Sequence, residues 1–117
     1  MSTEPIDLKE VLERVQDDKD LLLELFDIFQ EDYKVKRKTI DELVEKKDFE
    51  QLKAIAHSLK GASGNISAKK VHAIFIQLEQ MAKNKDLSQA KDLLSNLDKE
   101  YTALGAHIVQ LKQSFKK

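Results

Sequence analysis

The chain has 117 residues, a length that suits one domain with one hydrophobic core. It has no cysteine, which excludes disulfides and thiolate metal sites. The 20 basic and 21 acidic side chains leave a net charge of −1, so charge gives no reason to expect a nucleic-acid partner. No apolar run approaches the length of a membrane span, and the first residues lack the features of a signal peptide, so we expect a cytoplasmic protein that does not bind membranes.

The composition favours helices, because Leu, Lys, Glu, Asp and Ala are abundant whereas there are one proline and three glycines. The first predicted helix begins at Asp7, whose side chain can cap backbone N–H groups while Glu10 reaches back. A break at residues 17 and 18 separates it from a long second helix over residues 19–46. That helix contains a short basic tract, interpreted as a solvated surface, which comprises Lys34, Lys36, Arg37 and Lys38.

Two apolar stripes run along the second helix at helical spacing. The main stripe is predicted to face the core and comprises Leu22, Leu25, Phe26, Phe29, Tyr33, Ile40, Leu43 and Val44. The second stripe could hold either the short first helix or a partner, and it comprises Leu21, Ile28 and Val35.

Three more helices are expected from their capping residues. Asp48 with Gln51 repeats the first capping pattern and starts a third helix. Ser67 is the predicted N-cap of a fourth helix. Asp86 with Gln89 is predicted to open a fifth.

The joints between these helices are short, which places consecutive helices antiparallel to one another. We therefore predict an all-α fold: an antiparallel up-down four-helix bundle with a short N-terminal covering helix. Neither an internal repeat nor a second domain is visible, so we expect one domain over residues 1–117, with its core over about residues 7–115.

The third helix presents a histidine to solvent. At about 100° per residue, its apolar positions fall within an arc of about 120°, which predicts the core face. These positions are Leu52, Ile55, Ala56, Leu59, Ala62, Ser63 and Ile66. His57 lies about 160° from the centre of that arc, so it should point into water. Its neighbours on the outer face are Lys60, Gly61 and Gly64.

This outer face allows a plain interpretation and a functional one. A lone exposed histidine is commonly a surface residue, and the glycines could mark a helix end, although the apolar phase continues through Ile66. Glycine inside a helix costs about 1 kcal/mol relative to alanine, and core packing gives no reason for small residues on a solvent face. Bare backbone at Gly61 and Gly64 would let a bulky partner approach the imidazole. Lys60 would place a cation beside a phosphoryl group on the ring.

The stretch over residues 57–66, His-Ser-Leu-Lys-Gly-Ala-Ser-Gly-Asn-Ile, resembles the active-site stretch of histidine-phosphotransfer (HPt) domains. The family pattern is a histidine, an apolar residue two positions on, then Lys-Gly, small residues and a second glycine. The resemblance extends from about Asp7 to Leu111 and includes the pair Leu78-Glu79. One departure is Ser67, where many members have a third glycine; because serine caps helices well, we expect the turn to be kept.

The resemblance implies that His57 is phosphorylated on the ring nitrogen far from the backbone and that Lys60 stabilises the added group. Gly61 and Gly64 would keep the approach open for a response-regulator receiver domain. Glu79 would hydrogen-bond the other ring nitrogen and fix the tautomer.

The same resemblance implies a stoichiometric phosphoryl carrier rather than an enzyme. It would accept the group from one receiver aspartate and pass it to another, and a hybrid sensor histidine kinase would be a further partner. No cofactor is expected in this chain, because the receiver domain brings the Mg²⁺. We expect a monomer.

The remaining histidines, His72 and His107, lie at or beyond the edges of their apolar stripes and are interpreted as structural or surface residues. The chain lacks the ligand patterns of di-iron bundles and zinc proteases, so we expect no metal, and it lacks the glycine loops that bind ATP. Two alternatives stay open: a helical receiver-binding module without phosphotransfer, and a phosphatase-like bundle. The presence of both His57 and Lys60 counts against the first.

Overall fold

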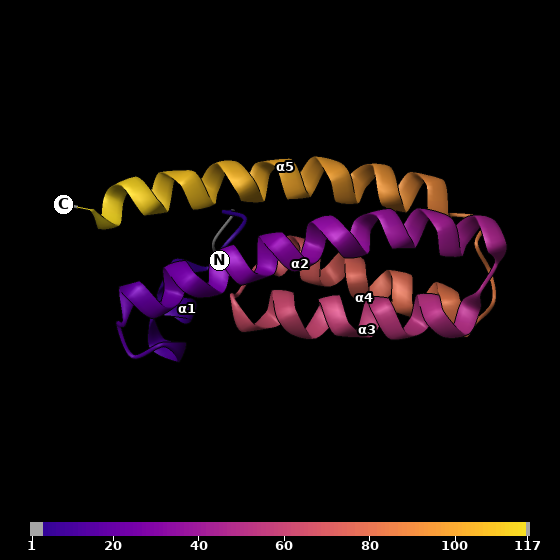
Figure 1. The fold of residues 1–117 in the computed structure, drawn as a ribbon, viewed down its shortest axis with the longest axis horizontal. Coiled ribbons are helices and arrows are strands. Elements are labelled where there is room, and N and C mark those ends of the chain that lie inside the picture. The colour runs from indigo at the N-terminus through magenta and orange to yellow at the C-terminus, as the bar shows by residue number, and fades with distance from the viewer. Residues whose placement is uncertain (1–3, 117) are drawn as a thin grey trace.

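The computed structural model describes residues 4–116, which form five helices and contain no strand (Figure 1). They are α1 (Leu8–Arg14), α2 (Lys19–Lys46), α3 (Phe49–Asn65), α4 (Lys69–Lys83) and α5 (Ala90–Phe115). Helices α2 to α5 run alternately up and down the long axis of a bundle that measures 47 × 23 × 20 Å. The predicted all-α bundle with a short N-terminal helix is confirmed.

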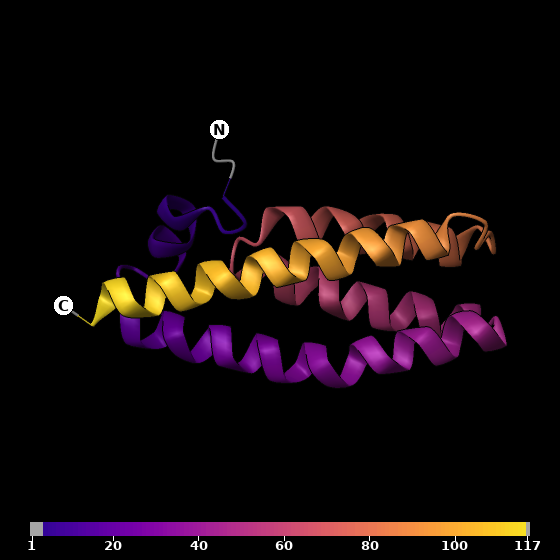
Figure 2. The same cartoon turned by 90° about the horizontal axis from the view of Figure 1, so that it is seen from above.

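The four long helices differ in length, and α1 occupies the space that this difference creates. Helices α2 and α5 have 28 and 26 residues, whereas α3 and α4 have 17 and 15. At 1.5 Å per residue, α2 and α5 therefore extend roughly 15 Å beyond the shorter pair. Figure 2 shows α1 beside this overhang, past the ends of α3 and α4. Ile6 and Val11, both completely buried there, close that end of the core.

The core consists of the inward stripes of all five helices. Its largest fully buried side chains are Phe26, Phe75, Ile6, Leu22, Ile40, Leu52, Leu59, Ile66, Leu78, Leu97, Leu104 and Ile108. The second apolar stripe of α2 stays outside this core: Leu21, Ile28 and Val35 are 41%, 63% and 68% exposed. The possibility that α1 covers this stripe is therefore wrong.

The basic tract of α2 is also only partly a solvated surface. Arg37 donates two hydrogen bonds to the Asp98 carboxylate of α5, at 2.8 and 3.0 Å, and so joins two helices. Lys36 donates to Ser58 of α3 at 2.7 Å. The solvated interpretation is wrong for these two residues, because α3 and α5 pack on either side of α2 and supply their partners.

The predicted N-caps are confirmed for α1 and α3, where Asp7 and Asp48 accept hydrogen bonds from backbone N–H groups three residues on. The predicted start of the last helix is wrong. Asp86 accepts from the N–H of Ser88, two residues on, and α5 begins only at Ala90. A short polar side chain can close such a local turn in place of the first turn of a helix, and here it does so.

The prediction that Ser67 caps the fourth helix is also wrong. Ser67 instead belongs to the turn that follows α3. Its N–H donates to the carbonyl oxygen of Gly64 at 3.1 Å, and the N–H of Ala68 donates to the carbonyl oxygen of Ser63 at 3.0 Å. This hydrogen-bond pair places Ser67, with φ of 54°, at the left-handed position that favours glycine. A glycine at this position would meet the same backbone requirement at lower cost. Ala68 is the N-cap of α4 and makes no side-chain cap bond.

Three other helix ends use the same geometry without glycine. After α1, Gln16 has φ of 54°, and the N–H of Asp17 bonds to the carbonyl of Leu12. Lys47 after α2 and Lys85 after α4 have φ of 56° and 54°. Each is followed by an N–H that reaches back to the carbonyl five residues earlier, in the pairs Asp48–Leu43 and Asp86–Met81. The low glycine count of the chain therefore does not reflect a lack of tight turns. These turns place glutamine, lysine and serine where glycine is favoured.

We predict that the Ser67→Gly variant is more stable than the Ser67→Ala variant. Its free energy of unfolding should be higher by up to about 1 kcal/mol, because alanine keeps the Cβ that disfavours the left-handed conformation. Both variants lack the hydroxyl, so their difference isolates the backbone contribution. Urea denaturation at one pH measures it. Equal stabilities would contradict a left-handed residue at this position.

Candidate functional site

His57 lies in the middle of α3 with its ring on the molecular surface, and its side chain is 69% exposed. The helical phase that buries Leu52, Ala56 and Leu59 turns His57 the other way. The outward orientation predicted from the sequence is confirmed. An exposed imidazole in a regular helix can meet a large partner without a cleft.

One carboxylate of the neighbouring helix contacts both His57 and Lys60. The Oε2 atom of Glu79 on α4 is 2.8 Å from Nδ1 of His57, and its Oε1 atom is 2.7 Å from Nζ of Lys60. The Glu79 side chain is only 16% exposed, because α4 packs along α3. The reach from Glu79 to the imidazole that the resemblance implies is therefore present.

Lys60 and His57 are placed so that they keep the Glu79 carboxyl ionised. The hydrogen bond from Lys60, followed by that from His57, holds the pKa of the Glu79 carboxyl below its ordinary value of 4.5, although its burial opposes this. An ionised carboxylate can only accept hydrogen bonds, so Nδ1 of His57 must carry the hydrogen. Neutral imidazole then has its lone pair on Nε2, the nitrogen that points away from Glu79.

The two glycines beside His57 differ in their surroundings. Both belong to α3, which continues to Asn65, and neither has a positive φ, so Gly61 does not end the helix. A Cβ at Gly61 would meet nothing within 4 Å. A Cβ at Gly64 would lie 3.3 Å from Cε1 of His72. The expectation that packing gives no reason for small residues is correct for Gly61 and wrong for Gly64, because a side chain of α4 rests there.

Two further contacts at this face were not expected from the sequence. Nδ1 of His72 lies 2.8 Å from the main-chain carbonyl oxygen of Lys60. Lys36 of α2 donates to Ser58, the residue after His57. The spacing of seven residues between His72 and Glu79, two helical turns, could have placed both on one face of α4. It could not have identified α3 as the surface they meet.

His107 has a structural position. It is buried in α5, where its Nδ1 accepts a hydrogen bond of 3.2 Å from the N–H of Ile6. The interpretation of His107 as a structural residue agrees with this buried position. The contact helps to hold the residues before α1 against the bundle.

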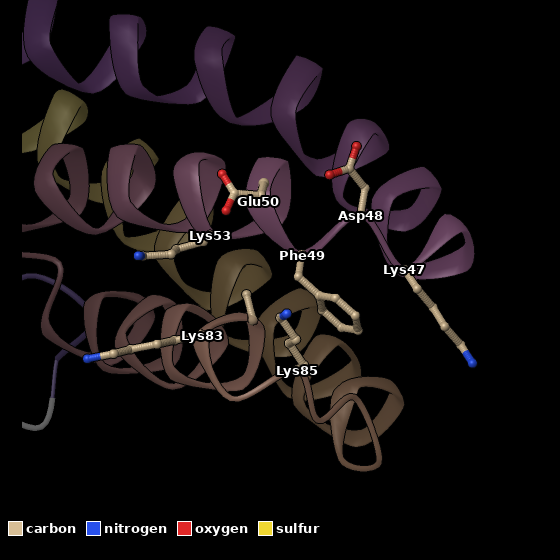
Figure 3. A pocket seen from close by; sticks show the side chains of 8 residues that line it. Lys47, Asp48, Phe49, Glu50, Lys53, Lys83 and Lys85 are labelled. Atoms are coloured by element: carbon tan, nitrogen blue, oxygen red, sulfur yellow. The ribbon is translucent and has the colours of Figure 1, made fainter.

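A hollow of about 370 Å³ lies elsewhere, around the α2–α3 and α4–α5 connections (Figure 3). Its lining mixes lysines with Asp48 and Glu50 around the ring of Phe49, and it includes none of His57, Lys60 and Glu79. No group of three or more metal-ligating side chains gathers anywhere within residues 4–116. Over the same residues, every helix is too short or too polar to cross a bilayer.

Comparison with known proteins agrees with this geometry. The model of the Hpt domain family matches residues 24–107. The crystal structure of histidine-containing phosphotransfer protein B (HptB) from Pseudomonas aeruginosa PAO1 superposes with a TM-score of 0.86 at 25% sequence identity, over 97% of this chain and 98% of that one. A search of curated proteins finds no match. The chain belongs to the Hpt domain family, whose members are phosphocarrier modules, and it functions in a phosphorelay.

Proposed function

We propose that His57 is the phosphoacceptor, and that the chain carries the phosphoryl group from the aspartate of one receiver domain to that of another. The observation that supports this role is the pairing of an exposed imidazole with a largely buried carboxylate on its Nδ1 side. A neutral histidine so held has its Nε2 lone pair directed away from Glu79 and available to a partner.

The acceptance step follows from this tautomer. The Nε2 lone pair attacks the phosphorus of a phosphoaspartate, an N–P bond forms, and the P–O bond to the aspartate breaks with its electron pair on the carboxylate. The ring keeps its Nδ1 hydrogen and becomes positively charged. The Glu79 carboxylate, 2.8 Å from Nδ1, stabilises that charge. Transfer to the next receiver reverses the same bonds.

Lys60 supplies the opposite charge. Its ammonium lies one helical turn from His57 and is held by Glu79 at 2.7 Å. A phosphoryl group on Nε2 adds negative charge to the surface beside it, and a nearby cation lowers the cost of that charge. The side chain of Lys60 is part-exposed, so the ammonium is free to turn from Glu79 toward the new group.

The surface around His57 supports a receiver domain as the partner. Gly61 leaves open space beside the ring. Between α2 and α3, the exposed Ile28 borders a shallow hollow of about 100 Å³ together with Ala62 and Asn65 of α3. An exposed helix face with apolar side chains fits a folded domain better than a small molecule, which favours an enclosed pocket. That domain brings its own Mg²⁺ and acidic pocket, so this chain needs no cofactor or metal.

Within this proposal the chain is a monomeric, cytoplasmic, stoichiometric carrier without kinase activity of its own. Its partners are the receiver domains of response regulators and a hybrid sensor histidine kinase, which also contains a receiver domain. A receiver-binding module without phosphotransfer would have no use for the contacts of Glu79 with His57 and Lys60.

We predict that His57→Gln abolishes label on this chain after incubation with a phosphorylated receiver, with little change in melting temperature because His57 is exposed. His107→Gln, which changes a histidine remote from the site, should still accept label. Radiolabelled phosphate resolved on a denaturing gel measures both. Normal label on the His57 variant would refute the assignment, and free phosphate without labelled protein would indicate a phosphatase.

We predict that Glu79→Gln lowers the free energy of unfolding at pH 7 by up to about 1 kcal/mol, because Lys60 and His57 lose an anionic partner. The folded-state pKa of Glu79 is lowered, so the stability it contributes is complete above its ordinary pKa and disappears as the pH falls through the lowered value. Denaturation from pH 7 into the acid range should therefore show the two proteins converging. A difference that persists when Glu79 is protonated would assign the effect to packing.

We predict that Gly61→Leu stabilises the protein and impairs docking together. An ordinary helical residue in open space should raise the free energy of unfolding by up to about 1 kcal/mol. The added side chain would obstruct a receiver, so receiver transfer should fall steeply, whereas phosphoramidate, a small donor, should still label His57. Ala103→Leu, on the exposed side of α5, adds bulk away from the site and should leave receiver transfer unchanged. Undiminished transfer to the Gly61 variant would place the docking surface elsewhere.

A further inference from the structure

His72 of α4 sits on the backbone of the active-site helix. A Cβ at Gly64 would lie 3.3 Å from Cε1 and 3.4 Å from Nδ1 of the imidazole, so the ring occupies the space that glycine leaves. Nδ1 is 2.8 Å from the carbonyl oxygen of Lys60, one turn before Gly64. A residue larger than glycine would require the ring to move by a few tenths of an ångström, at the point where it contacts that carbonyl.

The hydrogen bond fixes the direction of donation. A carbonyl oxygen only accepts, so Nδ1 of His72 carries the hydrogen and donates it to Lys60. The nearby hydroxyl of Ser63 donates to the carbonyls of Leu59 and Lys60, at 2.8 and 3.0 Å, so it leaves no hydrogen for the imidazole. Because Nδ1 keeps its hydrogen whether the ring is neutral or cationic, the contact does not depend on the protonation of His72.

Two contacts, seven residues apart on α4, therefore hold one stretch of α3. His72 binds the main chain of Lys60, and Glu79 binds the side chains of Lys60 and His57. A shift of α4 along α3 by even part of one turn, which is 5.4 Å, would remove Glu79 from a bond of 2.8 Å. The His72 contact opposes that shift, because its donor meets a single main-chain carbonyl.

We propose that His72 is a positioning residue for phosphoryl acceptance. Seated on Gly64, it sets the register of α4 on α3 that brings Glu79 to Nδ1 of His57. The absence of a side chain at Gly64 then makes space for the His72 ring, whereas the absence of one at Gly61 leaves space for the receiver domain. The inference rests on the proposed role of His57 and adds a residue that acts on it through Glu79.

The test compares substitutions that remove, replace or displace the donor. His72→Leu removes it, while His72→Asn places an amide N–H close to the position of Nδ1. Gly64→Ala displaces the ring without altering His72. Gly61→Ala is the matched control, because it makes the same change on the same face where nothing lies within 4 Å.

The first readout is the ¹⁵N–¹H spectrum of the His57 ring, which distinguishes the Nδ1–H from the Nε2–H tautomer. His72→Leu and Gly64→Ala should shift His57 from Nδ1–H toward a mixture, His72→Asn should restore it in part, and Gly61→Ala should leave the His57 signals unchanged. The second readout is labelling by phosphoramidate, which requires no docking. His72→Leu should slow it several-fold, and the pair His72→Leu with Glu79→Gln should be no slower than Glu79→Gln alone.

Unchanged His57 signals in both His72→Leu and Gly64→Ala, or additive losses in the double variant, would overturn the inference and leave His72 a packing residue. If His72→Leu does not fold, the comparison of Gly64→Ala with Gly61→Ala decides the same question. The proposed function itself fails separately, when His57→Gln still accepts label. If that variant is inert while all His72 variants label at the wild-type rate, only the role of His72 is wrong.

Discussion

Glu79 meets His57 because α4 lies against α3 along the length of both helices, with a glycine at the point where an imidazole crosses between them. His57, the proposed phosphoacceptor, is on the outside of the bundle, where solvent would leave a lone histidine with mixed tautomers. Its chemistry is therefore determined by a residue on another helix. The contacts of Glu79 with His57 and Lys60, and that of His72 with Gly64, all depend on the relative placement of these two helices.

This arrangement suits a carrier. A nucleophile in a pocket would exclude a folded partner, whereas an exposed histidine on a convex helix can meet several. In the proposed mechanism, the chain holds the His57 tautomer and the Lys60 ammonium in place, and the receiver domain supplies the metal. The exposed stripe of Leu21, Ile28 and Val35 on α2 adds apolar surface, and Ile28 borders a hollow that Ala62 and Asn65 of α3 also line.

The helix ends show a second constraint. Short connections between antiparallel helices require left-handed residues, and this chain supplies Lys47, Ser67 and Lys85 instead of glycine. Each costs backbone energy that the packed bundle has to offset. Ser67 is the most consequential, because its carbonyl also accepts the N–H of Asp7 at 3.0 Å. The end of α3 and the segment before α1 are thus joined at a residue with a left-handed backbone conformation.

Periodicity and capping chemistry were enough to predict the five helices, the inward stripes and the outward direction of His57, because these depend on residues close together in the chain. The motif at residues 57–66 also indicated the family. The sequence could not decide between local alternatives of similar energy, such as Ser67 as a helix start or a helix end and Asp86 as a cap or a turn, because packing selects between them.

Only the tertiary structure decided which residues meet across helices. Glu79 joins His57 and Lys60, His72 occupies Gly64, and Arg37 pairs with Asp98, each over a separation that no local pattern encodes. Gly61 and Gly64 are the same residue type on the same face, so the sequence assigned them one role. They differ because His72 lies against Gly64, whereas nothing lies against Gly61. The packing of α4 on α3 decides this, since the sequence of a helix specifies its faces but not which residues cover them.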